Sequence, residues 1–109
     1  MLEKALWLVK FTSSAGGYGS GVISFANSRV FGGDSTYYYS GSYQVRDNEI
    51  IATIHVKQHS EGISIFGSYP EFDLEMTGNI QQLSSVLIGY VKQMPQMRIT
   101  ASISKLEDI

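Results

Sequence analysis

Apolar and polar residues alternate with a period of two along almost the whole chain, and glycine, asparagine and aspartate interrupt the alternation at short intervals. The segment Arg29–Tyr43 shows this pattern in full, as a short run, a Gly-Gly-Asp break and a second run rich in tyrosine. A period of two places successive side chains on opposite faces of a β-strand, whereas a helix requires a period of 3.6. No stretch of useful length has helical periodicity, so we expect an all-β protein.

About eight segments read as strands, each bounded by turn-forming residues. They cover residues 5–12, 20–26, 29–31, 36–46, 49–58, 72–77, 84–92 and 97–105. Asp47 and Asn48 tolerate positive φ and predict a two-residue hairpin, and we place Pro95 in the turn before the last strand. Short strands at about 8–12-residue spacing are typical of antiparallel sandwiches and barrels. We predict a single domain over residues 1–109, an eight-stranded antiparallel up-and-down barrel of the calycin or lipocalin type.

The composition excludes several classes of function. The net charge of −2 lacks the positive field that carries binding to nucleic acids or anionic membranes, so we expect neither partner. The chain has no cysteine, which excludes disulfides, a thiol nucleophile and a cysteine-ligated zinc site. The apolar run Ala5–Val9 is shorter than the core of a signal peptide and far shorter than a membrane span. We therefore expect a cytoplasmic protein.

The titratable residues form no recognisable catalytic or metal-binding pattern. His55 and His59 are four residues apart, which on a strand separates them by about 13 Å, too far to share a metal ion. Asp73 and Glu75 alternate with apolar residues and are expected on a solvated outer face. No serine lies in a Gly-x-Ser-x-Gly elbow. We therefore expect neither an enzyme nor a cofactor.

Two segments, residues 6–9 and 86–91, are apolar on both faces of their predicted strands. One face fills the interior, and the other requires a cover, because the outer face of an antiparallel sheet is normally polar. We place Val86, Ile88 and Tyr90 inside. The cover is then either the 59–70 connection or N-terminus of the same chain, or a second copy in a homodimer. The predicted dimer face consists of Leu6, Leu8, Leu87 and Val91.

Two stretches, Gly21–Phe25 and Arg29–Tyr43, resemble the GrlR-type family of negative regulators of bacterial type III secretion. The most specific part is the Gly-Gly-Asp turn followed by Tyr-x-Gly-x-Tyr, and the similarity extends over most of the chain. It implies a small, dimeric, lipocalin-like barrel that holds a transcriptional activator in an inactive complex. The family's best-described regulator contacts its activator through an acidic loop. The matching stretch here has Arg46 followed by the candidate partner contacts Asp47, Asn48 and Glu49.

A second hypothesis is a barrel that binds a small apolar molecule or lipid inside. Eight-stranded barrels either hold one small ligand or are filled by side chains. On this hypothesis the 59–70 connection, with Ile63, Ile65 and Phe66, forms a lid over the mouth. The predicted cavity residues are Trp7, Val9, Tyr39, Tyr43, Ile54, Phe72, Ile88 and Ile99.

Overall fold

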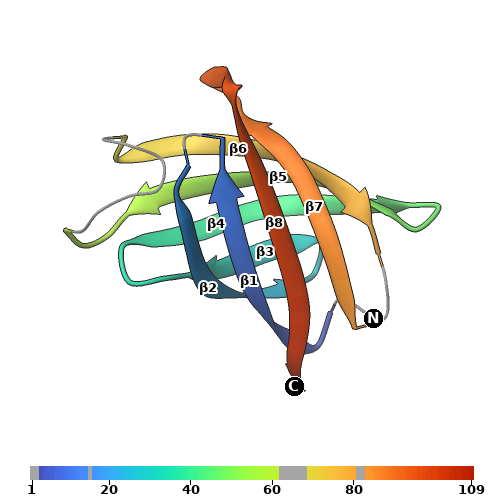
Figure 1. The fold of residues 1–109 in the computed structure, drawn as a ribbon. Coiled ribbons are helices and arrows are strands. Elements are labelled where there is room, and N and C mark those ends of the chain that lie inside the picture. The colour runs from blue at the N-terminus through green and yellow to red at the C-terminus, as the bar shows by residue number, and fades with distance from the viewer. Residues whose placement is uncertain (1–2, 15, 62–68, 81–82) are drawn as a thin grey trace.

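The computed structural model describes residues 3–14, 16–61, 69–80 and 83–109. Each strand pairs antiparallel with the next, and the last strand pairs with the first, so that the sheet closes into an up-and-down barrel (Figure 1). This confirms the predicted fold class, and the described residues contain no helix. The strands are β1 (Ala5–Ser13), β2 (Tyr18–Ala26), β3 (Arg29–Gly33), β4 (Tyr37–Arg46), β5 (Glu49–Gln58), β6 (Glu71–Asn79), β7 (Ser84–Val91) and β8 (Met94–Asp108).

The strands on the two sides of the barrel cross at a steep angle (Figure 1). In Figure 1, β1, β8 and β7 run across the front, while β3 to β6 lie behind them in a different direction. Two glycines allow the strands to approach closely. A Cβ added at Gly41 would lie 2.1 Å from the carbonyl oxygen of Thr53, and one at Gly89 would lie 1.8 Å from that of Glu75. Only glycine fits at such positions, which are typical of sharply bent strands.

Two-residue turns join β2 to β3 and β4 to β5. Asn27 and Ser28 have φ angles of 52° and 63°, and Asp47 and Asn48 have φ angles of 53° and 68°. Positive φ at both central residues is the requirement of the type I′ turn, whose twist matches that of the flanking strands. The predicted Asp47–Asn48 hairpin is confirmed.

Asp34 begins the turn between β3 and β4, whereas Gly32 and Gly33, which were predicted to belong to this turn, are the last two residues of β3. The Oδ1 atom of Asp34 accepts hydrogen bonds from the backbone N–H groups of Thr36 and Tyr37, each at 2.8 Å. The Oδ2 atom accepts a hydrogen bond from the hydroxyl of Tyr39. One carboxylate thus fixes the turn and the first residues of the tyrosine-rich strand.

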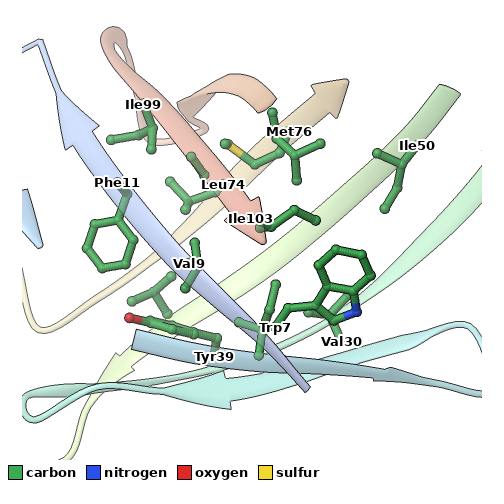
Figure 2. Close-up of a cluster of buried hydrophobic side chains, with 14 of the residues drawn as sticks. Trp7, Val9, Phe11, Val30, Tyr39, Ile50, Leu74, Met76, Ile99 and Ile103 are labelled. Carbon is green, nitrogen blue, oxygen red and sulfur yellow. The ribbon is translucent and has the colours of Figure 1, made fainter. Parts of the chain in front are cut away.

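The core fills the barrel with apolar side chains from every strand. Figure 2 shows side chains of β1, β3, β4, β5, β6 and β8 that point into this interior. The ring of Phe25 makes edge-to-face contacts with Trp7 at 6.4 Å and with Tyr43 at 5.2 Å between centroids. The carboxylate of Glu3 accepts hydrogen bonds from the Tyr43 hydroxyl at 2.5 Å and from the Ser28 N–H at 3.1 Å. The N-terminal segment is thereby fastened to this end of the barrel.

The structure corrects the predicted orientation of β7. Leu87 and Val91, predicted to face outward, are buried in the core, whereas Ile88, predicted to face inward, is 59% exposed. The prediction failed because both faces of this strand are apolar. The alternation then shows which residues share a face, but it does not show which face points into the core. We call this second property the phase of the strand. The pairing with β8 decides the phase. Leu87 lies opposite the buried Ala101, and residues paired across strands share a face.

The last hairpin also differs from the prediction. The turn between β7 and β8 consists of residues 92–93, and Pro95 is the second residue of β8. The register shifts between Tyr90 and Val91, so that Val91 pairs with Met94. Proline is tolerated there because it stands at the start of a strand, where a missing N–H removes little of the hydrogen-bond ladder.

Candidate functional site

The described residues line a small apolar cavity of about 70 Å³ in the interior of the barrel. Four of the predicted cavity residues line it: Val9, Tyr39, Ile54 and Ile99. Typical ligand pockets measure about 300–1,000 Å³. The cavity is therefore far smaller than the space that a lipid or a typical metabolite requires.

The other predicted cavity residues lie elsewhere. Trp7 and Phe72 are buried in the core without lining the cavity, and Tyr43 packs against the core from a partly buried position. The assignment of Ile88 to the cavity is wrong, because its side chain is on the outside. The predicted lid residues Ile63, Ile65 and Phe66 lie outside the described residues.

The predicted partner contacts Asp47, Asn48 and Glu49 lie at the tip of the β4–β5 hairpin. It extends beyond β3, whose last pairing with β4 joins Arg29 to Ser42, and it projects from the barrel in Figure 1. At its tip all four residues 46–49 are exposed. The carbonyl of Asn48 accepts a hydrogen bond from the N–H of Ile80 at 2.7 Å. The tip is therefore accessible and also held in place.

An apolar stripe lies on the outer face of β7, and we call it the β7 face (Val86, Ile88 and Tyr90). These side chains are 56%, 59% and 36% exposed. The neighbouring strand β8 presents short, exposed side chains beside it, with Ser102 opposite Val86 and Thr100 opposite Ile88. The residues beside Val86 and Ile88 are therefore short and uncharged, whereas Tyr90 lies opposite the exposed Arg98.

The β7 face and the outer leucines of β1 lie on the same side of the barrel, separated by β8. Leu6 and Leu8, predicted as dimer contacts, point outward and are half-buried. Leu87 and Val91, the other two predicted dimer contacts, are in the core, and Val86, Ile88 and Tyr90 are the exposed apolar residues of this strand. An outward apolar surface on β7 was thus correctly expected but assigned to the wrong residues.

Sequence reasoning missed a second group of exposed apolar side chains on β2, β3 and β4. Val22, Phe31 and Tyr38 are each between 41% and 45% exposed. The guanidinium of Arg29 lies 5.0 Å from the centroid of the Phe31 ring. The alternation pattern could have predicted this group, because it places these three apolar residues on the polar, outward face of their strands.

A polar network covers the outer face of β5 and β6. The imidazole of His55 lies between two carboxylates, with Nδ1 2.7 Å from Asp73 Oδ1 and Nε2 2.7 Å from Glu71 Oε2. Glu75, also on the outer face as predicted, accepts a hydrogen bond from the Thr53 hydroxyl at 2.9 Å and lies 3.6 Å from the ammonium of Lys92. Sequence reasoning did not foresee the contact of His55 with these carboxylates.

The described residues contain no group of three or more histidine, cysteine, aspartate or glutamate side chains arranged to hold a metal ion. They also include no helix of the length and apolarity needed to cross a membrane. A comparison of the chain with models of protein families and with curated proteins found no match.

Proposed function

We propose that this chain is a non-enzymatic regulator that binds other proteins through its outer surface, in the manner of the GrlR-type family it resembles. The observation that carries the proposal is the β7 face, where apolar side chains point into solvent instead of the core. Clustered exposed apolar residues are typical of protein interaction sites. The small interior cavity supports the same choice, because it leaves little room for a ligand.

The proposed role of the β7 face is homodimerisation. The adjoining outer face of β8 carries short hydroxyl side chains at Thr100 and Ser102, which allow a second sheet to pack closely. On the far side of β8, Leu8 lies opposite Ser104, whereas Lys10 lies opposite Ser102, so Leu8 borders the proposed contact. The proposed contact between two copies thus covers the outer faces of β7 and β8.

Analytical ultracentrifugation at micromolar concentration tests this role. We expect the wild-type chain to sediment as a dimer and the Ile88→Glu variant as a folded monomer, because a carboxylate in an apolar interface lacks a partner. Ser42→Glu adds the same charge on the exposed outer face of β4 and is the matched control. A monomeric wild-type protein, or a dimeric Ile88→Glu variant, would contradict the proposal.

The proposed contact for the regulated partner is the hairpin tip, with Asp47, Asn48 and Glu49. The resemblance implies a transcriptional activator as partner, and this places the chain in the cytoplasm. The tip differs from the family's acidic loop because Arg46 contributes a positive charge. A held, exposed tip with two carboxylates suits recognition of a basic surface.

Affinity capture with a charge-neutral tip tests this contact. The double variant Asp47→Asn, Glu49→Gln removes both carboxylates, and asparagine keeps the positive φ that position 47 requires. We expect the wild-type chain to retain a protein from native bacterial extract that the double variant loses. Equal retention by both proteins, or no retained protein, would count against the tip as the contact.

Binding of a small apolar molecule in the interior is the second candidate function. Its support is the entirely apolar lining of the cavity. Extraction of the purified protein with organic solvent, followed by mass spectrometry, tests it. Recovery of a stoichiometric lipid or metabolite would favour the interior over the surface as the site of function.

A further inference from the structure

The imidazole of His55 makes two contacts that only its charged form can satisfy. Both ring nitrogens lie 2.7 Å from a carboxylate oxygen, one of Asp73 and one of Glu71. An ionised carboxylate accepts hydrogen bonds but donates none, and neutral imidazole has a single N–H. The neutral ring would therefore place one nitrogen lone pair against a carboxylate oxygen. The geometry requires the imidazolium form.

Asp73 connects this pair to the turn between β7 and β8. Its Oδ2 accepts a hydrogen bond from the amide of Gln93 at 2.9 Å, and its N–H donates to the Gln93 side-chain oxygen at 3.0 Å. Its carbonyl also accepts the N–H of Lys92 at 2.8 Å. Asp73 is thus held from two directions and has little freedom to leave His55.

Glu71, in contrast, has an alternative partner. In the β5–β6 register Lys57 lies directly opposite Glu71, whereas His55 lies opposite Asp73 and reaches Glu71 diagonally. Among the described residues, Glu71 forms an ion pair with His55 and forms none with Lys57. The side chain of Glu71 therefore has two cationic neighbours and binds the diagonal one.

We propose that His55, Glu71 and Asp73 form a pH-dependent clasp on the outer face of β5 and β6. While His55 is protonated, it holds both carboxylates. When His55 loses its proton, the bond to Asp73 persists and Glu71 transfers to Lys57. The clasp thereby changes the charge pattern at the start of β6 without unfolding the barrel.

The surrounding charges are consistent with a transition centred on His55. On β4 the residue opposite His55 is the uncharged Ser40, and on β5 its outer-face neighbours are Thr53 and Lys57. On β6, Glu75 is engaged by Thr53 and by Lys92 of the adjacent turn. Lys57 is therefore the cation on β5 available to Glu71 when the imidazole is neutral.

The hydrogen bond that His55 donates to Asp73 raises the pKa of His55 above its ordinary value; desolvation opposes this rise, and the hydrogen bond donated to Glu71 adds to it. The bond to His55 is also the main cause that lowers the pKa of Asp73. A raised histidine pKa means that the contact stabilises the fold fully below about pH 6.5, the value of an unfolded histidine. This stabilisation is lost as the pH rises through the folded-state pKa of His55.

Nuclear magnetic resonance of the ¹⁵N- and ¹³C-labelled full chain tests the clasp. At pH 6 we expect both ring nitrogens of His55 to be protonated. On raising the pH, the side-chain signals of Glu71 and Lys57 should shift with the same midpoint as the His55 ring. In Glu71→Gln this midpoint should fall by roughly 0.2–0.7 pH units, the equivalent of one exposed ion pair.

Lys57→Gln separates the clasp from a general effect of pH. This variant removes the alternative partner, so the Glu71 signals should no longer move toward the lysine-bound state while His55 still titrates. His59→Gln removes the second histidine, so the remaining ring signals are those of His55. The contacts of His55 with Asp73 and Glu71 stay unchanged in this variant. A His55 midpoint at about 6.5, as in an unstructured peptide, or a midpoint unchanged in Glu71→Gln, would overturn the proposal.

Discussion

Asp34 links the turn between β3 and β4 to the tyrosine-rich strand that follows it. Its carboxylate accepts hydrogen bonds from the N–H groups of Thr36 and Tyr37, which fixes the turn. It also accepts a hydrogen bond from the hydroxyl of Tyr39. Burial raises the pKa of Tyr39, and the hydrogen bond to Asp34 raises it further, so this hydroxyl remains a donor at any physiological pH. Asp34 thus has a structural role, because it holds the turn and the first residues of β4 together.

Removal of the Asp34 carboxylate should destabilise the barrel. We expect Asp34→Ala to lower the free energy of unfolding by about 1–3 kcal/mol, because it leaves part-buried donors without an acceptor. Tyr39→Phe removes only one donor and leaves the turn bonds intact, so it should cost about 0.5–1.5 kcal/mol. Urea denaturation measures both values. Equal stability of Asp34→Ala and wild type would show that water replaces the carboxylate.

At the scale of strands, local chemistry decided what the sequence could predict. The hairpin at Asp47 and Asn48 was predictable because two adjacent residues tolerate positive φ. The phase of β7 was not predictable from that strand alone, because Leu87 and Ile88 are equally apolar. The contact of His55 with Glu71 could not be predicted from the sequence either. A long connection joins β5 to β6, and only a short turn would have fixed their register.

The corrected phase of β7 is tested by two adjacent substitutions. Leu87→Ala should lower the free energy of unfolding by about 2–5 kcal/mol, since Leu87 is 7% exposed and lines the cavity. Ile88→Ala should change the stability of the monomer by no more than about 0.5 kcal/mol. Chemical denaturation at a concentration below dimer formation makes the comparison. A larger loss of stability in Ile88→Ala than in Leu87→Ala would mean that Ile88 faces the core, as the sequence alone predicted.

The close approach of β6 and β7 is tested at Gly89. Gly89→Ala would place a Cβ 1.8 Å from the Glu75 carbonyl oxygen, so the strands must separate and lose pairing. We expect a loss of about 1–3 kcal/mol in the free energy of unfolding, comparable to overpacking of a core. Thr100→Ala on the exposed face of β8 is the control and should be nearly neutral. A neutral Gly89→Ala would mean that the sheet relaxes without cost.

For the whole molecule, the closed barrel determines where function can reside. Closure pairs the strands around the ring and leaves a filled interior with about 70 Å³ of space. The prediction of a barrel was accessible because alternation and turn spacing persist along the chain. Whether the barrel is hollow was not accessible, because it depends on the phase of β7 and on how Trp7 and Phe72 pack. We therefore propose that the protein binds its partners on the outside of the barrel, a second copy at the β7 face and another protein at the hairpin tip.

Native mass spectrometry of the purified chain tests this assignment most directly, because one spectrum reports both the subunit number and any retained molecule. The account predicts a mass twice that of the 12.1 kDa chain, with no additional bound mass. The Ile88→Glu variant should appear at the mass of a single chain. A monomeric wild-type protein that carries a stoichiometric small molecule would contradict the account and place the function inside the barrel.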